Sequence, residues 1–500
     1  MVDYVTQRSV AQAPPVAAVG LPSPDPLTGG VGAGGSGAVT SEAEAGDHRS
    51  GNQAGPGAGH QRPAQRGDGT PRRTVLLVGG YGLIGNALAH RLLRDGHEVI
   101  LAVRRADAAG RIGGLREVHL DYSGDPDPSL LQTLEGVDVV ANTAGVFAER
   151  AGASFDDVHV YGPCKLFTLA ARAGVARVIQ VSALGAAPDA PTAYWRSKAG
   201  GDACAWEFPG VAVVVRPSLV FAEAGASTAW FLRLASMPWL PLPDGGQAAV
   251  QPIHLDDLVD GLAALVTQPN PPRELAAVGP QPMPLADYLR ALALPLGLRP
   301  RITGVPAAMV RALLPLAGRI SSEMVDADSL RMLEAGSCAD PTTWRSLLGR
   351  ELRYPGSFTR TPLAPALRQR AMLANLVPLL RVANSAIWLV TAWVSLFVFP
   401  REASLELLLR SQVPAVLAPA ALTGAALLDA VLGLAMWVGR WRRAVYWLQL
   451  GLMAFYTVVI TVWLPEFWAH PYGPVLKNLA VLGLILVLLR LEEPRGLRRR

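Results

Sequence analysis

Residues 75–105, which read VLLVGGYGLIGNALAHRLLRDGHEVILAVRR, decide the fold of the first half of this chain. An apolar run comes first, and a glycine-rich turn, an amphipathic helical segment and a second apolar run follow it. Gly79, Gly82 and Gly85 are spaced three residues apart in the turn. Because these glycines follow an expected strand and open an expected helix, the stretch predicts a βαβ unit that binds a dinucleotide.

The residue types in the turn match what a bound pyrophosphate needs. Gly79 permits the tight turn, Gly82 lets the backbone approach the pyrophosphate, and Gly85 lets the helix lie against the strand. The pyrophosphate then lies at the helix N-terminus, where free N–H groups and the helix dipole favour negative charge. The residues expected to contact the cofactor here are Gly79, Gly80, Tyr81, Gly82, Leu83, Ile84 and Gly85.

The end of the second apolar run bears on which dinucleotide is bound. An NAD site usually carries an acidic residue there, which binds the ribose 2′-hydroxyl. This chain has Arg104 and Arg105 in that region and no carboxylate. Arginine suits a 2′-phosphate, so NADP is the expected cofactor and NAD is the alternative. The alternative interpretation is that the two arginines only mark a strand end that is exposed to solvent.

Composition restricts the classes of protein. Five hundred residues suggest more than one domain, and half of the residues are hydrophobic, with a mean hydropathy of +0.27. The net charge of +5 is modest, and no basic patch is interleaved with aromatic residues, so no nucleic-acid partner is expected. Cys164, Cys204 and Cys338 are far apart and lack metal-ligand spacing. We therefore expect no disulfide framework, no metal and a reducing compartment.

The chain divides into three parts. Residues 1–72 are rich in Gly, Ala and Pro, with Tyr4 as their one aromatic residue, and are expected to be disordered. Residues 73–370 alternate apolar strands with helical segments, which predicts an α/β fold: a doubly wound parallel-sheet Rossmann domain. Its later part, about 280–370, is expected to be mainly helical and to cap the substrate cleft. The expected strands are Val75–Val78, Val99–Val103, Val137–Asn142, Val178–Val181 and Val211–Arg216.

Residues 371–500 form a different kind of domain. Four apolar segments, at 382–399, 413–438, 445–464 and 474–489, approach the length needed to span a bilayer and predict a four-helix transmembrane bundle. Arginines precede the first segment, separate the second from the third and follow the fourth. The positive-inside rule then predicts a multi-pass protein of the inner membrane, with both termini and the Rossmann domain in the cytoplasm.

Three residues between 182 and 198 have a catalytic pattern. Ser182 ends an expected strand, and Tyr194 and Lys198, four residues apart, lie on one helix face. A phenol titrates near pH 10, too high for acid–base catalysis at neutral pH. A nearby ammonium and the positive nicotinamide favour the phenolate and lower its pKa. The lysine can also bind the nicotinamide ribose, and the serine can hold a substrate carbonyl. An exposed helix face is the alternative interpretation of the Tyr–Lys spacing.

With these residues in place, the chain resembles the short-chain dehydrogenase/reductase superfamily, in its extended or atypical NAD(P)-binding branch. The resemblance covers about 73–370 and rests on ordered motifs: GGYGLIG at 79–85, LDYSGD at 120–125, NTAG at 142–145, VSALGA at 181–186, YWRSK at 194–198 and RPSLVF at 216–221. It implies that Ser182, Tyr194 and Lys198 are a catalytic triad. It also implies that these residues contact the cofactor: Asp121 at the adenine, Asn142, Thr143, Ala144 and Gly145 beside it, Lys198 at the ribose, and Arg216, Pro217 and Ser218 at the nicotinamide end.

Two positions depart from the family pattern. The family often has Thr or Ser just before the first glycine, where this chain has Val78. It usually has asparagine where this chain has His159. That histidine either alters a proton relay or is an ordinary partly buried side chain.

The C-terminal segments resemble the DoxX-like membrane family. The similarity lies in LLDAVLGLAMW at 427–437, RWRRAVYWLQL at 440–450 and HPYGPVLKNLAVLGLILVLLRLEE at 470–493. Within them, Asp429 and Lys477 are ionisable groups at apparent membrane depth, where charges are expensive and often functional. Two interpretations stay open: Lys477 pairs with Asp429, or it snorkels to the interface.

These features favour a membrane-anchored NADP-dependent oxidoreductase that transfers hydride between the nicotinamide and a carbonyl or hydroxyl substrate. Attachment to the lipid bilayer suggests a lipophilic substrate. An NAD-dependent epimerase or dehydratase would use the same residues. Another alternative is a non-catalytic NADPH-binding assembly or sensor module, like the accessory subunit of respiratory complex I, with a membrane-protein partner docked on the DoxX-like helices. Transport by the helices themselves is the weakest candidate.

Overall fold

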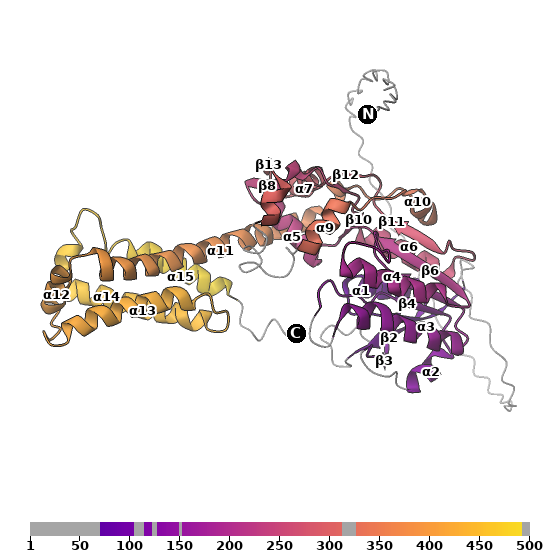
Figure 1. The fold of residues 1–500 in the computed structure, drawn as a ribbon, viewed down its shortest axis with the longest axis horizontal. Helices are drawn as coiled ribbons and strands as arrows, with labels where there is room; N and C mark the ends of the chain where they lie inside the picture. Colours follow the sequence, from indigo (N-terminus) through magenta and orange to yellow (C-terminus); the bar gives the residue numbers. More distant parts are fainter. Residues whose placement is uncertain (1–70, 105–114, 123–127, 150–152, 313–326, 493–500) are drawn as a thin grey trace, which may run out of the picture. The chain divides into compact units, whose positions relative to one another are not determined.

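The computed structural model describes residues 71–104, 115–122, 128–149, 153–312 and 327–492. In this part of the chain, seven parallel strands form one sheet in the order β11-β6-β5-β4-β1-β2-β3 (Figure 1). The strands are β1 Thr74–Val78, β2 Glu98–Val103, β3 Arg116–His119, β4 Val139–Asn142, β5 Arg177–Val181, β6 Val211–Pro217 and β11 Glu274–Ala277. The expected strands are confirmed, and β3 and β11 are additional.

Helices cover both faces of this sheet because its central strands are apolar on both sides. Val75 and Leu77 of β1 join one buried cluster, which α1 (Leu83–Arg94), α6 (Leu255–Thr267) and α10 (Thr342–Leu348) cover. Leu76 and Val78 join a second cluster on the opposite face. The helices of that face are α2 (Pro128–Leu134), α3 (Gly162–Arg172) and α4 (Ala193–Trp206). The doubly wound Rossmann domain is therefore confirmed.

The strand order also positions the predicted cofactor site. β1 pairs with β2 on one side and with β4 on the other, so the direction of winding reverses at β1. In open α/β sheets, ligands bind in the crevice at the carboxyl ends of the strands at such a reversal. The glycine turn after β1 and the NTAG motif after β4 both lie at that edge.

The two strands that the sequence pattern missed have weak strand signals. β3 is four residues long with only Val118 buried, and β11 has the sequence ELAA, without β-branched or aromatic residues. β11 forms because its backbone pairs with β6 from Val214 to Pro217. Whether an edge strand of this kind forms depends on its pairing partner rather than on the local β-propensity of its sequence.

The region that was expected to be mainly helical, about 280–370, is mixed. It contains β12 (Met283–Pro284), which pairs with β9 (Ala249–Val250), and β13 (Arg301–Val305), which pairs with β8 (Trp239–Pro243). Among the described residues, its helices include α7 (Leu285–Ala293), α9 (Ala327–Ala335) and α10, and residues 307–312 are helical as well. α7 and α5 (Ala226–Ala235) share a buried cluster with the first turns of α11 (Ala364–Trp393).

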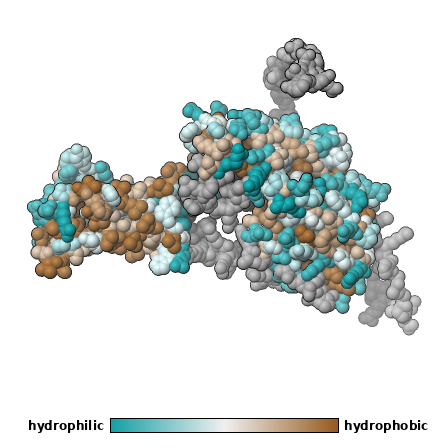
Figure 2. Space-filling view, viewed as in Figure 1, coloured by the Kyte–Doolittle hydropathy of each residue, from teal (hydrophilic) through white to brown (hydrophobic). Residues whose placement is uncertain are grey.

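The C-terminal part is helical. It comprises α11, the π-helical turn η6 (Val394–Val398), α12 (Arg401–Arg410), α13 (Ala418–Ala435), α14 (Arg442–Trp463) and α15 (Asn478–Leu491). Among the described residues, three helices are long and apolar enough to span a membrane: 361–398, 418–435 and 442–463. Large apolar side chains such as Leu434 and Leu448 are exposed on them, and Figure 2 shows hydrophobic surface gathered over these helices.

One expectation about these helices needs correction. The fourth predicted span, 474–489, forms a helix only from Asn478 and has 14 residues, because turns with Pro474 and the positive-φ Gly473 precede it. It is shorter than the roughly 20 residues that a span needs.

Some expectations lie outside the described residues. The tail predicted at 1–72 is described only from residue 71, and Arg105 and the arginines at 495–500 are not described.

Candidate functional site

The turn between β1 and α1 has a geometry that demands glycine. Gly79 has φ +79°, and the N–H of Gly82 donates to its carbonyl oxygen at 2.8 Å. A Cβ on Gly85 would lie 2.2 Å from the same oxygen. Any side chain there would therefore clash with backbone. Gly80, Tyr81, Leu83 and Ile84 complete the turn, and the Tyr81 hydroxyl donates to Glu117 of β3.

The segment after β4 packs directly behind this turn. A Cβ on Gly79 would be 2.9 Å from the nitrogen of Ala144, and the Thr143 hydroxyl donates to the Val78 carbonyl at 2.7 Å. Asn142 is fully buried and donates to Gln180 Oε1 at 2.8 Å. Its own Oδ1 accepts the Ala144 N–H, at 3.2 Å. These bonds hold the NTAG motif against the predicted pyrophosphate turn.

Gly145 is the point where the cofactor motifs meet the Tyr–Lys pair. A Cβ on Gly145 would lie 3.1 Å from Lys198 Nζ and 3.5 Å from His159 Nε2. Lys198 and Tyr194 are on α4, whose N-cap Thr192 accepts from the N–H of Trp195 at 3.3 Å. Segments 79–85, 142–145 and 194–198, far apart in sequence, thus converge at one edge of the sheet.

Burial determines the electrostatics of this pair. Tyr194 and Lys198 are 8% and 4% exposed. Burial lowers the pKa of Lys198 to about 8, although the nearby Asp202 carboxylate opposes this shift. Burial alone raises the pKa of Tyr194. Lys198 Nζ donates to the Val181 carbonyl at 3.1 Å, so the ammonium is held in place at neutral pH.

Ser182, the third predicted catalytic residue, is bonded away from Tyr194. Its hydroxyl donates to Asp202 Oδ2 at 2.8 Å, and both side chains are buried. The next residue, Ala183, packs in the same buried cluster as Tyr194. The side chain that packs in the cluster around Tyr194 is therefore the methyl group of Ala183, while the Ser182 hydroxyl points to Asp202.

Asp202 is the main residue that the sequence analysis missed. It is fully buried, and its Oδ2 also accepts from Arg216 Nε and Nη2 at 3.2 and 3.1 Å. Burial raises its pKa, whereas the bonds from Ser182 and Arg216 lower it. Its spacing, four residues after Lys198 on the same helix face, was the available signal.

His159 is a buried structural histidine rather than a free proton carrier. It lies in the π-helical turn η1 (Asp157–Tyr161), where its Nε2 accepts the Val146 N–H at 3.1 Å. Nδ1, 2.9 Å from Ser197 Oγ, must then carry the ring proton. Burial, with a smaller effect of Lys198, lowers its pKa to about 3. The neutral ring ties the loop after β4 to α4.

Aromatic side chains surround Tyr194. Phe147 stacks on its ring with a centroid distance of 5.2 Å, and Phe155 and His159 lie edge-on at 6.0 and 5.6 Å. Phe147 is 82% exposed, which is unusual for so large an apolar side chain. The approach to Tyr194 is therefore apolar.

The remaining predicted cofactor residues are placed as follows. Arg104 is exposed directly after β2, and Asp121 follows β3. Arg216 and Pro217 end β6; the Arg216 guanidinium binds Asp202 and Glu274, and the Ser218 hydroxyl donates to the Gln251 carbonyl at 2.5 Å. Within the described residues, no group of three or more His, Cys, Asp or Glu side chains could hold a metal ion.

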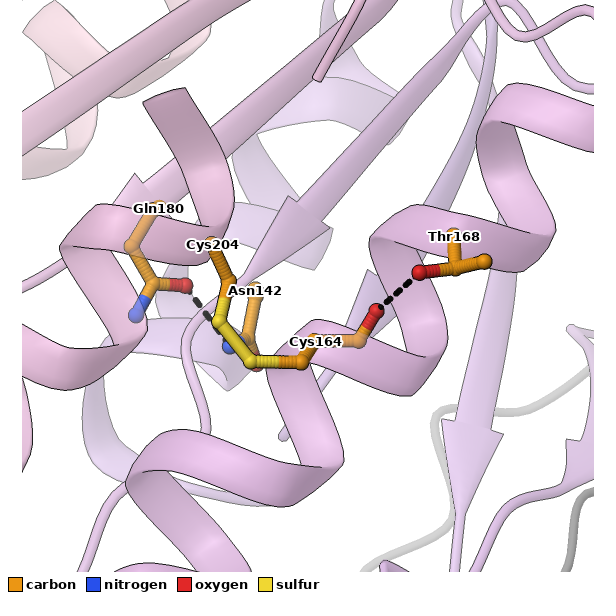
Figure 3. Close-up of a disulfide and its surroundings, with 5 residues drawn as sticks. All are labelled: Asn142, Cys164, Thr168, Gln180 and Cys204. Carbon is orange, nitrogen blue, oxygen red and sulfur yellow. Dashed lines mark hydrogen bonds between the residues drawn. A yellow bond between two sulfur atoms is a disulfide. The ribbon is translucent and has the colours of Figure 1, made fainter. Parts of the chain in front are cut away.

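The cysteines bear on the expectation of no disulfide framework and a reducing compartment. Cys164 of α3 and Cys204 of α4 form a disulfide, with their Cα atoms 5.1 Å apart (Figure 3). The two are 40 residues apart in sequence, but their helices pack side by side on one face of the sheet. Such a bridge is uncommon in a reducing cytosol, so it argues against the expected compartment.

Alkylation tests the disulfide directly. We expect that iodoacetamide, added to the denatured but unreduced protein, modifies Cys338 only, because Cys338 is the free and exposed cysteine of the described residues. Mass spectrometry after reduction should then show Cys164 and Cys204 unmodified. Labelling of all three cysteines before reduction would show that α3 and α4 carry thiols.

Two family models match the chain. The NAD dependent epimerase/dehydratase family matches residues 75–277, and the DoxX-like family matches residues 385–486. The first match covers the sheet and the Tyr–Lys pair, and the second covers the C-terminal helices.

Curated relatives match the Rossmann part. An epimerase family protein of Mycobacterium bovis is 30% identical over 260 residues, which are 48% of this chain and 83% of that protein. A ceramide reductase of Caulobacter vibrioides is 28% identical over 47% of this chain and 74% of that protein. A mitochondrial NADH dehydrogenase 1 alpha subcomplex subunit 9 of Dictyostelium discoideum is 28% identical over 39% of this chain. The chain covers only 56% of that subunit.

The sheet order, the glycine turn, the Tyr–Lys pair and these matches agree with one another. The chain belongs to the NAD dependent epimerase/dehydratase family of the short-chain dehydrogenase/reductase type and carries a DoxX-like domain after its Rossmann domain.

Proposed function

We propose that this protein is a membrane-anchored NAD(P)-dependent oxidoreductase that acts on a carbonyl or hydroxyl group. The observation that carries the proposal is the convergence at Gly145, where Lys198 Nζ lies beside the motif behind the dinucleotide turn. A module that only bound the cofactor would not need a buried tyrosine and lysine at this point.

The residues have distinct roles in this proposal. Bound NAD(P)H supplies the hydride. Tyr194 gives its proton to the carbonyl oxygen of the substrate and takes it back in the reverse direction. The Lys198 ammonium stabilises the phenolate and binds the nicotinamide ribose. Because the pKa of Lys198 is about 8, the ammonium form predominates at neutral pH.

Ser182 has a restricted role as long as its hydroxyl donates to Asp202. The oxygen can then accept a hydrogen bond from a substrate hydroxyl, but it has no proton to donate to a carbonyl. This geometry suits the alcohol form of the substrate. Asp202 and Arg216 act through Ser182 as positioning residues.

The substrate is proposed to be lipophilic. Phe147 and Phe155 make the surroundings of Tyr194 apolar, and the C-terminal helices would keep the enzyme at a bilayer. One relative is named as a ceramide reductase, and ceramide is a lipid. The arginine distribution supports an inner-membrane protein with its Rossmann domain in the cytoplasm. The disulfide opposes the cytoplasmic assignment, and the alkylation of the denatured, unreduced protein tests whether this disulfide forms.

The activity is tested on the full-length protein in detergent. NADPH binding is measured first, and NADPH oxidation is then followed with long-chain ketones, quinones and keto-lipids. Oxidation with at least one of these classes supports the oxidoreductase. Exchange of stereochemistry without net NADPH oxidation would instead identify an epimerase.

Arg104 tests the choice of NADP over NAD. Its exposed guanidinium follows β2, where a 2′-phosphate would lie. A hydrogen bond between charged groups contributes about 1.5–3 kcal/mol, so Arg104→Ala should weaken NADPH binding roughly ten- to hundredfold. NADH binding, measured in the same titrations, is the internal control and should stay the same. An unchanged preference would remove the argument for NADP.

A second candidate is an NADPH-binding assembly or sensor module without turnover. Two features favour it. The Ser182 hydroxyl donates to Asp202, and the next residue, which packs in the cluster of Tyr194, is Ala183, so neither Ser182 nor Ala183 offers a hydroxyl hydrogen to a substrate carbonyl. Several relatives are named as complex I subunits. Tight NADPH binding without oxidation, together with co-purification of a membrane protein through the C-terminal helices, would support this candidate.

A further inference from the structure

The C-terminal helices bury polar side chains on the sides that face one another. We call Asn384, Ser385, Asp429, Tyr446 and Gln449 the polar core; their exposed fractions are 0, 4, 6, 0 and 0%. They come from α11, α13 and α14, whose outer surfaces are apolar. Polar side chains buried within membrane helices are costly, so each needs a reason.

Helix packing explains part of the polar core. Asn384 donates to Gln449 Oε1 at 2.9 Å, and this bond joins α11 to α14. Ser385 donates to the Gly433 carbonyl at 2.8 Å, and this bond joins α11 to α13. Such bonds between membrane helices stabilise a bundle. They give no role to Asp429 or to the Tyr446 hydroxyl.

Several atoms of this region have no partner. Among the described residues of the bundle, the buried side-chain atoms without a hydrogen bond include Asn384 Oδ1, Trp388 Nε1 and Asp429 Oδ1, whereas the Tyr446 hydroxyl interacts with Arg381. No ion pair joins Asp429 to any described residue, and Lys477 is exposed ahead of α15, which excludes the pairing interpretation. A buried unpaired carboxylate is so unfavourable that the group takes up a proton instead.

The charged groups near the polar core lie at one end of it. Arg381 of α11 and Arg442 of α14 both bind Glu492, and we call these three the charged end. Tyr446 lies within electrostatic reach of all three of them. Tyr456 of α14 is the titratable side chain that senses the charge of Asp429. The charged side chains of α12 are Arg401, Glu402, Glu406 and Arg410, and none forms an ion pair with Asp429.

We propose that Asp429 is an intramembrane proton-binding site of the bundle. Gln449 Nε2 donates to the carbonyl of Leu432, three residues after Asp429 on α13, at 3.4 Å, and Tyr456 senses the charge of Asp429, so these two residues of α14 lie beside the site. In the neutral state Asp429 carries the proton as a carboxylic acid, and release of the proton leaves a buried carboxylate without an ion-pair partner among the described residues. This site does not depend on the activity proposed for the Rossmann domain.

Infrared difference spectroscopy of the full-length protein in lipid nanodiscs tests the proton. Between neutral and strongly alkaline pH, we expect to lose the C=O stretching band of a protonated carboxylic acid. Asp429→Asn should lack this band, while Asp429→Glu should keep it at a shifted frequency and show that the fold tolerates the position. Glu466→Gln, which removes an exposed carboxylate paired with Arg410, should keep it unchanged. A wild-type spectrum without the band, or a band that survives in Asp429→Asn, would overturn the proposal.

Isotope exchange tests the path of the proton. On transfer into D₂O the acid band shifts, and Tyr456→Phe and Gln449→Leu, the two α14 residues beside the site, should each slow that shift several-fold. Thr423→Val is the matched control, because Thr423 is exposed on α13 and bonds only to the carbonyl of Pro419 in its own helix. Equal exchange rates in all variants would remove Tyr456 and Gln449 from the path of the proton.

Discussion

Tyr194→Phe is expected to abolish most of the turnover and to leave cofactor binding intact. The substitution removes one hydroxyl from a ring that stays packed between Phe147, Phe155 and His159, so the fold should persist. Proton transfer by a positioned side chain contributes about 10²–10⁴-fold to a rate, and kcat should fall by that amount. The measurement is NADPH oxidation with the best substrate of the screen, with NADPH affinity measured by fluorescence.

Ser182→Ala provides the comparison for this result. Its hydroxyl is already donated to Asp202, so we expect its loss to reduce turnover less than the loss of the Tyr194 hydroxyl. If Tyr194→Phe turned over at the wild-type rate, the acid–base role of Tyr194 would be wrong. If the wild type bound NADPH but oxidised it with no substrate, the binding module would be the better conclusion.

Gly85→Ala is expected to eliminate useful cofactor binding. Its Cβ would lie 2.2 Å from the carbonyl oxygen of Gly79 and 2.6 Å from Thr143 Oγ1, and neither neighbour is the end of a flexible side chain. The turn must therefore open where the pyrophosphate would bind. Overpacking costs typically about 1–3 kcal/mol. If only the cofactor-bound form of the protein bears this cost, the affinity for NADPH falls roughly ten- to hundredfold. Calorimetric titration with NADPH measures the loss.

Gly136→Ala is the matched control for this substitution. A Cβ on Gly136 would have no neighbour within 4 Å, so NADPH affinity and thermal stability should stay near the wild-type values. Equal affinities for Gly85→Ala and Gly136→Ala would show that the cofactor does not depend on the close approach at Gly85. A lower melting temperature for Gly85→Ala alone, at full affinity, would assign the glycine to folding.

Local sequence patterns predicted most of the Rossmann domain because its signals are local. A buried parallel strand is a short apolar run, and the glycine turn is a contiguous motif, so β1, α1 and β2 could be placed from residues 75–105 alone. The apolar segments at 413–438 and 445–464 likewise correspond to α13 and α14. Edge strand β11 could not be predicted, because its formation depends on pairing with β6.

Several features of the candidate site depend on contacts between distant segments. The spacing of Tyr194 and Lys198 indicated one helix face, but the approach of Lys198 to Gly145 requires the packing of α4 against the segment after β4. The partner of Ser182 is 20 residues away on that helix. The Cys164–Cys204 bridge contradicts the sequence expectation, because distance along the chain does not measure the distance between two packed helices.

The sequence by itself determined the family, the dinucleotide turn and the presence of an apolar helical domain, since strand, turn and helix signals act over a few residues. The tertiary structure alone decided the direction of the Ser182 hydroxyl, the two bonded nitrogens of His159 and the isolation of Asp429 from Lys477. The physical reason is that a hydrogen bond or an ion pair depends on distances of about 3–4 Å, which packing sets and the order of residues does not.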